Sequence, residues 1–326
     1  MSATPAKTSI ELVTPNLDDC DRITSLINRS ESYDGIPRVL STVEFREELE
    51  DPSIDLQRDC RMAIVDGELV GWVLVNHTPT GERQEKAHIG GDVDPRHRDR
   101  RVGRTLMAWA LGVATERLNL VDSDLPKYIR VYGYEQTSDL HRLTTRFGFT
   151  PVRYFEELLM PLTPRPALTE LPGVAIIAWP TDRSDELRVV KNSAFEDHWA
   201  STPLSADDWT KWLGHFGSRL DLSFAAIDEA TGNLVGYCVN MHYPADEVLL
   251  GRRDGWIDNL GTLREWRGRG IASSMIAHSL DAFARAGFTH ASIGVDSASP
   301  TGASRLYRNI GFELQHRVIA SEIQVA

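Results

Sequence analysis

A glycine- and arginine-rich stretch, residues 261–272, has the residue types of an anion-binding loop. It follows a predicted strand and leads into a predicted helix. Gly268 and Gly270 let the backbone approach a ligand closely, and the first N–H groups of a helix have no partner within it. With the helix dipole these donors could bind pyrophosphate, and Arg267 and Arg269 add positive charge. The alternative is a basic surface turn that caps the helix, since neither a P-loop nor a dinucleotide fingerprint is present.

The same pattern of landmarks occurs twice along the chain. Three pairs of segments follow one another in the same order at nearly one spacing: Gly67–Val75 and Gly232–Asn240 (232 − 67 = 165), Arg98–Gly103 and Arg267–Ala272 (267 − 98 = 169), and Gly148-Phe149 and Gly311-Phe312 (311 − 148 = 163). This period is too long for a solenoid repeat and indicates a duplicated domain.

Two segments of the second copy resemble the GNAT superfamily of N-acyltransferases. The spacing Arg267-x-x-Gly270-x-Ala272 is similar to its acyl-CoA-binding motif, and residues 303–312 are similar to its Ala-x-x-Leu-Tyr-x-x-x-Gly-Phe segment. Since both copies carry the pattern, the chain resembles tandem-domain GNAT acetyltransferases of the mycothiol synthase type. The resemblance implies an α/β (α+β) fold of two tandem GNAT-like domains, each a mixed, mostly antiparallel sheet flanked by helices.

The resemblance also implies a reaction. Acetyl-CoA is the expected cosubstrate, its pantetheine arm would enter where two central strands splay apart, and the amine of a small molecule would attack its thioester directly. The expected activity is therefore N-acetyl transfer. The alternative is a non-catalytic acyl-CoA-binding or structural module.

For the second copy the resemblance assigns the cofactor loop and a general acid. Backbone N–H groups of residues 268–272 would hold the pyrophosphate, and the candidate cofactor-binding residues are Leu263, Arg267, Gly268, Arg269, Gly270, Ile271 and Ala272. Tyr307 matches the family's tyrosine and would protonate the leaving thiolate, because a phenol stays protonated at neutral pH. Its alternative role is an aromatic ring packed beneath the Gly-Phe turn.

The strand before the loop offers a candidate general base. Many family members place a glutamate six residues ahead of the position of Thr262, where this chain has Trp256. Strand alternation would put Trp256, Asp258, Leu260 and Thr262 on one face. Asp258 could then point into the cleft and take the amine proton, or be a structural carboxylate bound to loop N–H groups.

The first copy departs from the motif. Arg101 stands where the first motif glycine belongs, and Thr144 stands where the second copy has its tyrosine. By register, its candidate cofactor-binding residues are Val93, Arg98, Arg101, Val102, Gly103 and Arg104, and the alternative is a solvated basic loop. A threonine hydroxyl is a poorer acid for a thiolate, so we expect turnover in the second copy.

Aromatic and imidazole side chains gather in residues 198–215, near the first helices, where such folds place the acceptor site. They are His198, Trp199, Trp209, Trp212 and His215. They could line a pocket or pack a core, and the i, i+3 spacing of Trp209 and Trp212 favours the core. His198 is a secondary candidate for the base, although a lone histidine is more often structural.

A repeated set of elements must position these residues. Each copy predicts an opening strand, a helical region, a β-hairpin, a strand that enters the loop, a helix, and a last strand and short helix before the Gly-Phe pair. Four prolines in residues 161–173 predict an extended linker. We therefore expect a first domain over residues 1–160 with a degenerate motif, and a second, catalytic domain over residues 174–326.

The composition excludes several classes of protein. The 326 residues are 41% hydrophobic and 25% charged, as in soluble globular chains, and a net charge of −12 disfavours nucleic acid as a partner. No apolar run is long enough for a membrane span and no signal-peptide pattern is present, so we expect a cytoplasmic protein. The three cysteines lack paired spacing, which argues against disulfides or a metal site. We expect a monomer or homodimer that acts on a small-molecule amine.

Overall fold

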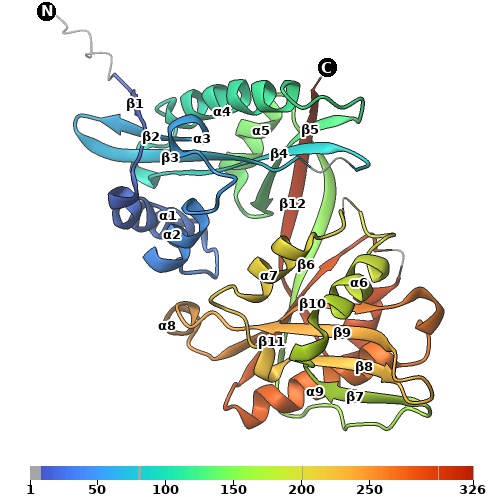
Figure 1. Cartoon of the computed structure of the whole chain (residues 1–326). Helices are drawn as coiled ribbons and strands as arrows, with labels where there is room; N and C mark the ends of the chain where they lie inside the picture. Colours follow the sequence, from blue (N-terminus) through green and yellow to red (C-terminus); the bar gives the residue numbers. More distant parts are fainter. Residues whose placement is uncertain (1–8, 80–81, 200, 300, 326) are drawn as a thin grey trace, which may run out of the picture. The chain divides into compact units, whose positions relative to one another are not determined.

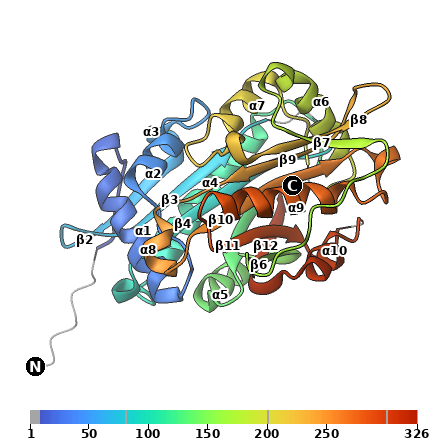
Figure 2. The same cartoon turned by 90° about the horizontal axis from the view of Figure 1, so that it is seen from below.

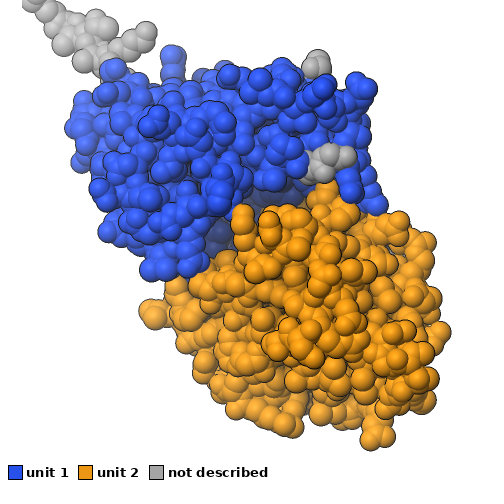
Figure 3. All heavy atoms as spheres, in the orientation of Figure 1, with its two compact units in different colours: residues 1–152, 319–326 blue, residues 153–318 orange. Residues whose placement is uncertain are grey.

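The structure is a computed structural model that describes residues 9–79, 82–199, 201–299 and 301–325 (Figure 1). The chain forms two compact units (Figure 3). Unit 1 comprises Met1–Val152 and Ile319–Ala326, and unit 2 comprises Arg153–Val318. Strands and helices alternate in both units, which confirms the predicted α/β class. Within the described ranges, no helix combines the length and the apolar character that a membrane span requires.

Unit 1 is built on a mostly antiparallel sheet. Its strands lie in the order β1-β2-β3-β4-β5, with β12 (Glu313–Val325) beside β5, and β4 pairs with β5 in parallel. The strands are β1 Glu11–Val13, β2 Cys60–Val65, β3 Glu68–His77, β4 Glu85–Val93 and β5 Lys127–Tyr134. The helices are α1 Cys20–Asp34, α2 Thr42–Leu49, α3 Leu56–Asp59, α4 Val102–Asn119 and α5 Ser138–Arg146.

Unit 2 repeats this arrangement. Its strands lie in the order β7-β8-β9-β10-β11-β6, with β12 beside β6, and β10 pairs with β11 in parallel. The strands are β6 Thr150–Pro161, β7 Val174–Ala178, β8 Phe224–Asp228, β9 Leu234–Met241, β10 Asp254–Thr262 and β11 His290–Asp296. The helices are α6 Ser184–Ala194, α7 Ala206–Leu213, α8 Asp246–Leu250, α9 Ile271–Arg285 and α10 Ala303–Ile310.

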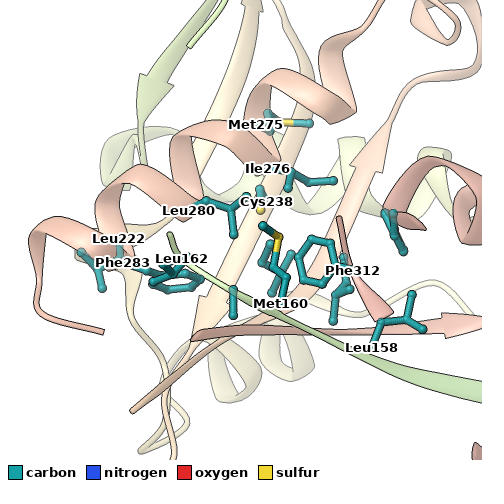
Figure 4. Packing of buried hydrophobic residues seen from close by; sticks show 14 of the residues in the cluster. Leu158, Met160, Leu162, Leu222, Cys238, Met275, Ile276, Leu280, Phe283 and Phe312 are labelled. Atoms are coloured by element: carbon teal, nitrogen blue, oxygen red, sulfur yellow. The ribbon is translucent and has the colours of Figure 1, made fainter. Parts of the chain in front are cut away.

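The central strand β9 is buried along its whole length, because helices cover both of its faces. On one face α9 packs its apolar stripe, in which Met275, Ile276 and Leu280 share one core cluster with Cys238 of β9 (Figure 4). Helices α6 and α7 lie on the other side of β9 from α9 (Figure 2), and their apolar side chains share a core cluster with Tyr237 and Val239. The two layers give unit 2 two hydrophobic cores, one on each side of the sheet.

Glycine conformations confirm two of the predicted boundaries. The hairpin between β2 and β3 turns at Asp66 and Gly67, which have φ values of 51° and 82°, as a two-residue turn with both centres left-handed requires. The helix predicted over residues 271–285 is α9, and Gly287, just beyond its end, has φ 83°.

The division of the chain differs from the expected one. It falls between residues 152 and 153, and residues 161–173 belong to unit 2. Leu162 is 2% exposed in the core of unit 2, Leu171 packs against that core, and Arg165 pairs with Asp281 of α9. The prolines predict an extended backbone correctly, but they carry no information about which unit that backbone packs on. Nor does the repeat pattern predict that the end of β12 belongs to unit 1.

Candidate active site

Strands β10 and β11 separate halfway along their length. Their parallel pairing runs from Asp254 opposite His290 to Ile257 opposite Ile293. Beyond this point β10 continues in register with β9, while β11 continues in register with β6. The splay that the resemblance implies for the pantetheine arm is therefore a feature of unit 2.

A β-bulge lies where the two strands part. Ile257 pairs with Asn240 and Asn259 pairs with Val239, so Asp258 is the extra residue of β10. The bulge changes which side chains share a face. Ile257 and Leu260 both pack in the core beneath α9.

The expectation that Trp256, Asp258, Leu260 and Thr262 share one face is therefore wrong for Leu260 and for Thr262. Trp256 packs in the core beneath α6 and α7, on the opposite side of the sheet from Leu260. A Cβ built on Gly261 would meet Tyr237 and Ala194 of that same α6 core, so alternation returns Thr262 to the side of Leu260. Trp256 and Asp258 do lie together. One inserted residue in the pairing explains the change, and the sequence pattern does not reveal it.

Asp258 occupies an apolar environment on the α6 side. The indole of Trp212 on α7 donates a hydrogen bond to its carboxylate. Burial raises the pKa of Asp258 to about 6, and the bond from Trp212 opposes the rise. The neighbouring Tyr237 donates its hydroxyl to the side-chain oxygen of Asn259, the next residue of the bulge. Sequence analysis missed Tyr237, because only strand pairing reveals that it faces the bulge.

The loop after β10 has the backbone of an anion site. Gly268 and Gly270 adopt left-handed φ values of 76° and 82°, and α9 begins directly after Gly270. Gly270 has no side chain to cap the helix, so among the described residues the first N–H groups of α9 donate no bond to an N-cap side chain. Leu263 fixes the start of the loop, since its N–H donates to Val235 O (2.9 Å). Ile271 is 2% exposed and anchors the helix in the core.

The loop arginines hold the loop in place. Arg267 Nη2 donates to Ala194 O at the end of α6 (2.9 Å), its Nε donates to Thr262 O (3.2 Å), and it pairs with Asp197 at 3.5 Å. Arg269 lies over the Trp266 ring, 4.5 Å from the centroid. Arg267 therefore stabilises the conformation of the loop, and its positive charge is paired with the Asp197 carboxylate.

Tyr307 lies on α10 with its ring in the core beneath α9. The residue is 7% exposed, and the ring meets Phe312 edge-on at 6.3 Å, so the packing role is present. Burial, and then the nearby Cys238, raise the pKa of Tyr307 above its ordinary value. The pKa of Tyr237 is raised by burial and further by Asp258, Cys238 and Tyr307. The candidate acid and base therefore both lie near Tyr237.

Glu156 of β6 orients the helix that carries Tyr307. Its carboxylate accepts from Ser304 Oγ (3.1 Å) and Arg308 Nη2 (2.8 Å) of α10, and from Arg317 at 3.5 Å. Glu156 is 6% exposed. Sequence analysis missed this residue, because β6 is separated from α10 by most of unit 2.

The loop of unit 1 has the same backbone without the glycines. Arg98 Nε donates to Val93 O (3.4 Å), as Arg267 does to Thr262, and the Arg98 guanidinium pairs with Asp34. Asp99 and Arg101 hold left-handed φ values of 60° and 71° at the positions of Gly268 and Gly270. This conformation is costly for residues with a Cβ.

The other candidates of unit 1 form the start of α4. Val102 is buried, Arg104 is exposed, and a Cβ on Gly103 would meet Leu143 at 3.3 Å. Thr144 differs from Tyr307 in its contacts. Its hydroxyl lies 3.0 Å from Leu140 O and 3.1 Å from His141 O, so it bonds within its own helix.

The aromatic cluster near residues 198–215 divides into two roles. Trp209 is 2% exposed, donates to Ser184 Oγ (2.9 Å) and stacks on Trp179, which is core packing. Trp212 instead reaches Asp258. His198 lies 3.2 Å from Trp199 O and 5.2 Å from the Phe195 ring.

Comparison with known proteins gives matches over both halves of the chain. The model of the acetyltransferase (GNAT) family matches residues 26–134 and 185–312. A mycothiol acetyltransferase of Tsukamurella paurometabola is 26% identical over 238 residues, which cover 70% of this chain and 75% of the relative.

Solved structures share the fold over almost the full length. A GCN5-related N-acetyltransferase from Sphaerobacter thermophilus has a TM-score of 0.79 at 24% identity, covering 98% of this chain and 96% of that one. A tandem GNAT protein from the clavulanic acid biosynthesis pathway has a TM-score of 0.71 at 16% identity, covering 98% and 99%. The predicted tandem arrangement of two GNAT-like regions is thereby confirmed.

Proposed function

Because the chain belongs to the acetyltransferase (GNAT) family and is an acyltransferase, we propose that it is an acetyl-CoA-dependent N-acetyltransferase of a small-molecule amine, with its chemistry in unit 2. One observation carries this proposal. In unit 2 the splayed strands, the left-handed glycine loop, a half-buried carboxylate and a buried phenol occur together around β9 and β10.

The residues of unit 2 fit acetyl-CoA. The backbone N–H groups of residues 268–272 would hold the pyrophosphate, and the glycines there leave room because nothing lies within 4 Å of a Cβ built on Gly268. Thr262 Oγ1, at the end of β10, is buried, has no hydrogen-bond partner among the described residues, and would suit an amide of the pantetheine arm. When bound, acetyl-CoA supplies an acetyl group activated as a thioester.

Asp258 and Tyr307 are the residues that would move protons. With a pKa of about 6, the Asp258 carboxylate is mostly ionised at neutral pH and can accept a proton from an ammonium or amine. Its oxygens would take that proton directly or through one water. Tyr307 keeps the proton on its Oη at neutral pH, because burial raises its pKa, and would donate it to the departing thiolate.

Unit 1 keeps the loop but not the acid. Its loop backbone matches that of unit 2, so we propose that it can bind the same pyrophosphate. The hydroxyl of Thr144 is bonded within its helix, which leaves no hydroxyl at the register of Tyr307 to protonate a thiolate. We therefore assign turnover to unit 2.

Calorimetric titration with acetyl-CoA, followed by a thiol-release assay over a panel of small amines, tests the proposal. Binding together with amine-dependent release of CoA supports N-acetyl transfer. Binding without release on any amine favours the alternative, a non-catalytic acyl-CoA-binding module, for which Trp256 at the position of the family's glutamate is the supporting observation.

A further inference from the structure

A lysine is buried on the inner face of α6. Lys191 is 7% exposed, and its ammonium lies 5.8 Å from the centroid of the Phe195 ring. Within the part of the chain that the structure describes, this ammonium has neither a hydrogen bond nor an ion pair. Phe195 in turn lies 6.5 Å from the ring of Tyr237, whose hydroxyl bonds Asn259 beside the bulge. The charge therefore lies on the side of the sheet that carries Asp258.

A matched pair of side-chain bonds aligns α6 with its counterpart in unit 1. Asn192 Nδ2 donates to Leu204 O (3.0 Å), and Leu204 N donates back to Asn192 Oδ1 (2.8 Å). Asn28 and Leu40 make the same two bonds, at 2.8 Å and 2.9 Å. The offset is 192 − 28 = 164, and it holds for both partners because 204 − 40 is also 164. Position by position, α1 residues thus correspond to α6 residues.

At the position of Lys191, unit 1 has Ile27. Ile27 is 2% exposed and belongs to a hydrophobic core cluster of its unit. The fold therefore accepts an apolar side chain there, and unit 2 places a charge in the same location. Burying a charge without a partner opposes folding, so the lysine is not explained by the stability of the helix.

Burial lowers the pKa of Lys191 to about 8, and no charged neighbour contributes to the shift. The side chain is still mostly protonated at neutral pH. An ammonium in apolar surroundings gains most from an anion that arrives with a ligand, because the low dielectric strengthens the attraction.

We propose that Lys191 binds a carboxylate of the acceptor, so that the acceptor class is an amino-carboxylic acid whose amine is directed towards Asp258. The inference rests on the proposed function. A carboxylate fits better than a phosphate, because a single ammonium balances one negative charge, and burial is the sole cause of its pKa shift among the described residues.

Matched acceptor pairs test the proposal. The kcat/KM for thiol release is measured with L-leucine and isoamylamine, and with L-phenylalanine and phenethylamine, so that each pair differs in the carboxylate alone. For the wild-type protein we expect the amino acid of each pair to be favoured by about 10- to 100-fold, the scale of one hydrogen bond to a charged group. In Lys191→Ile, which copies unit 1, this ratio should fall towards one. The exposed Lys211 of α7 provides the control, because Lys211→Met should leave the ratio as it is.

Thermal unfolding supplies a readout that does not depend on activity. Lys191→Ile should raise Tm by roughly 2–8 °C, because it removes a buried charge. If the Lys191→Ile protein does not fold, Lys191→Met, which keeps the length of the side chain, replaces it in this measurement. A fall in Tm for both variants would make the lysine structural and overturn the proposal.

The activity outcomes separate the two proposals. If wild type and Lys191→Ile acetylate both members of each pair with the same ratio, the carboxylate site is overturned while N-acetyl transfer stands. An equal loss on both members also overturns it, since Lys191 would then serve the reaction rather than the carboxylate. If wild type acetylates no member of any pair or of the amine panel, the proposed function fails and the carboxylate site fails with it.

Discussion

Replacing Asp258 by asparagine separates its catalytic and structural roles. The side chain keeps its size and can still accept from Trp212, but it cannot take a proton from the amine. Loss of a positioned base costs about 10²–10⁴-fold in rate, so we expect a fall of that size in kcat/KM for the amine. The wild-type profile of kcat/KM should rise through pH 6 as Asp258 ionises, and Asp258→Asn should lose that limb.

The same variant should be more stable than wild type at high pH. The pKa of Asp258 rises from 3.8 in the unfolded chain to about 6 in the folded one. A carboxyl with a raised folded pKa favours folding while it is protonated, and this contribution is lost as the pH increases through 6. A shift of about two pKa units corresponds to at most about 3 kcal/mol. Asp258→Asn should therefore gain up to that amount at pH 8 and little at pH 4.

Equilibrium unfolding in urea at pH 4 and pH 8 measures this difference. Asp207 of α7 is exposed, so Asp207→Asn is a matched control and should change neither the stability nor the pH profile. If Asp258→Asn keeps the acidic limb of the rate profile, Asp258 is not the base. If it unfolds more easily at pH 8, the carboxylate is instead a stabilising ion, and the assignment of its environment is wrong.

Three further changes test the rest of the site. Tyr307→Phe should lower kcat by about 10²–10⁴-fold with the affinity for acetyl-CoA unchanged, whereas Thr144→Val should keep kcat; the reverse result would place turnover in unit 1. Gly270→Val should weaken the binding of acetyl-CoA measured by calorimetry, because it disturbs a left-handed residue of the loop. Gly251 is also left-handed but lies outside the loop, so Gly251→Val is the control for backbone strain alone. Arg101→Gly should raise the free energy of unfolding by up to about 1 kcal/mol, because it removes a strained left-handed arginine; a loss of stability in urea would contradict this.

The parts of the molecule predicted from the sequence are those set by local chemistry. The helix over residues 271–285 follows from apolar periodicity between two glycines, and the hairpin at Asp66-Gly67 follows from a turn that needs two left-handed residues. The duplication is visible because the same turns and loops recur at one spacing. The helix and the hairpin are thus local signals, and the duplication is a comparison of such local signals between the two halves of the chain.

The parts that the sequence did not predict depend on pairing between distant segments. The bulge at Asp258 appears only when β10 is set against β9, since the extra residue has no compositional mark. The bonds from Glu156 to α10 depend on β6 lying beside β11. In the same way, Arg267 resembles a ligand for phosphate in sequence, and only the position of the end of α6 reveals that it fixes the loop.

Comparison of the two copies separates what the fold requires from what the chemistry requires. Both loops adopt left-handed residues at equivalent positions, with glycine in one and arginine in the other, so the fold imposes that conformation. At two other positions the copies differ in chemistry. Unit 2 has Tyr307 where unit 1 has the buried Thr144, and Lys191 where unit 1 has the buried Ile27. Burying a titratable side chain lowers the stability of the protein when the fold also accepts a side chain that does not titrate at that position. The reaction and the acceptor of this enzyme should therefore be sought at these two positions, on the two faces of the strand β9.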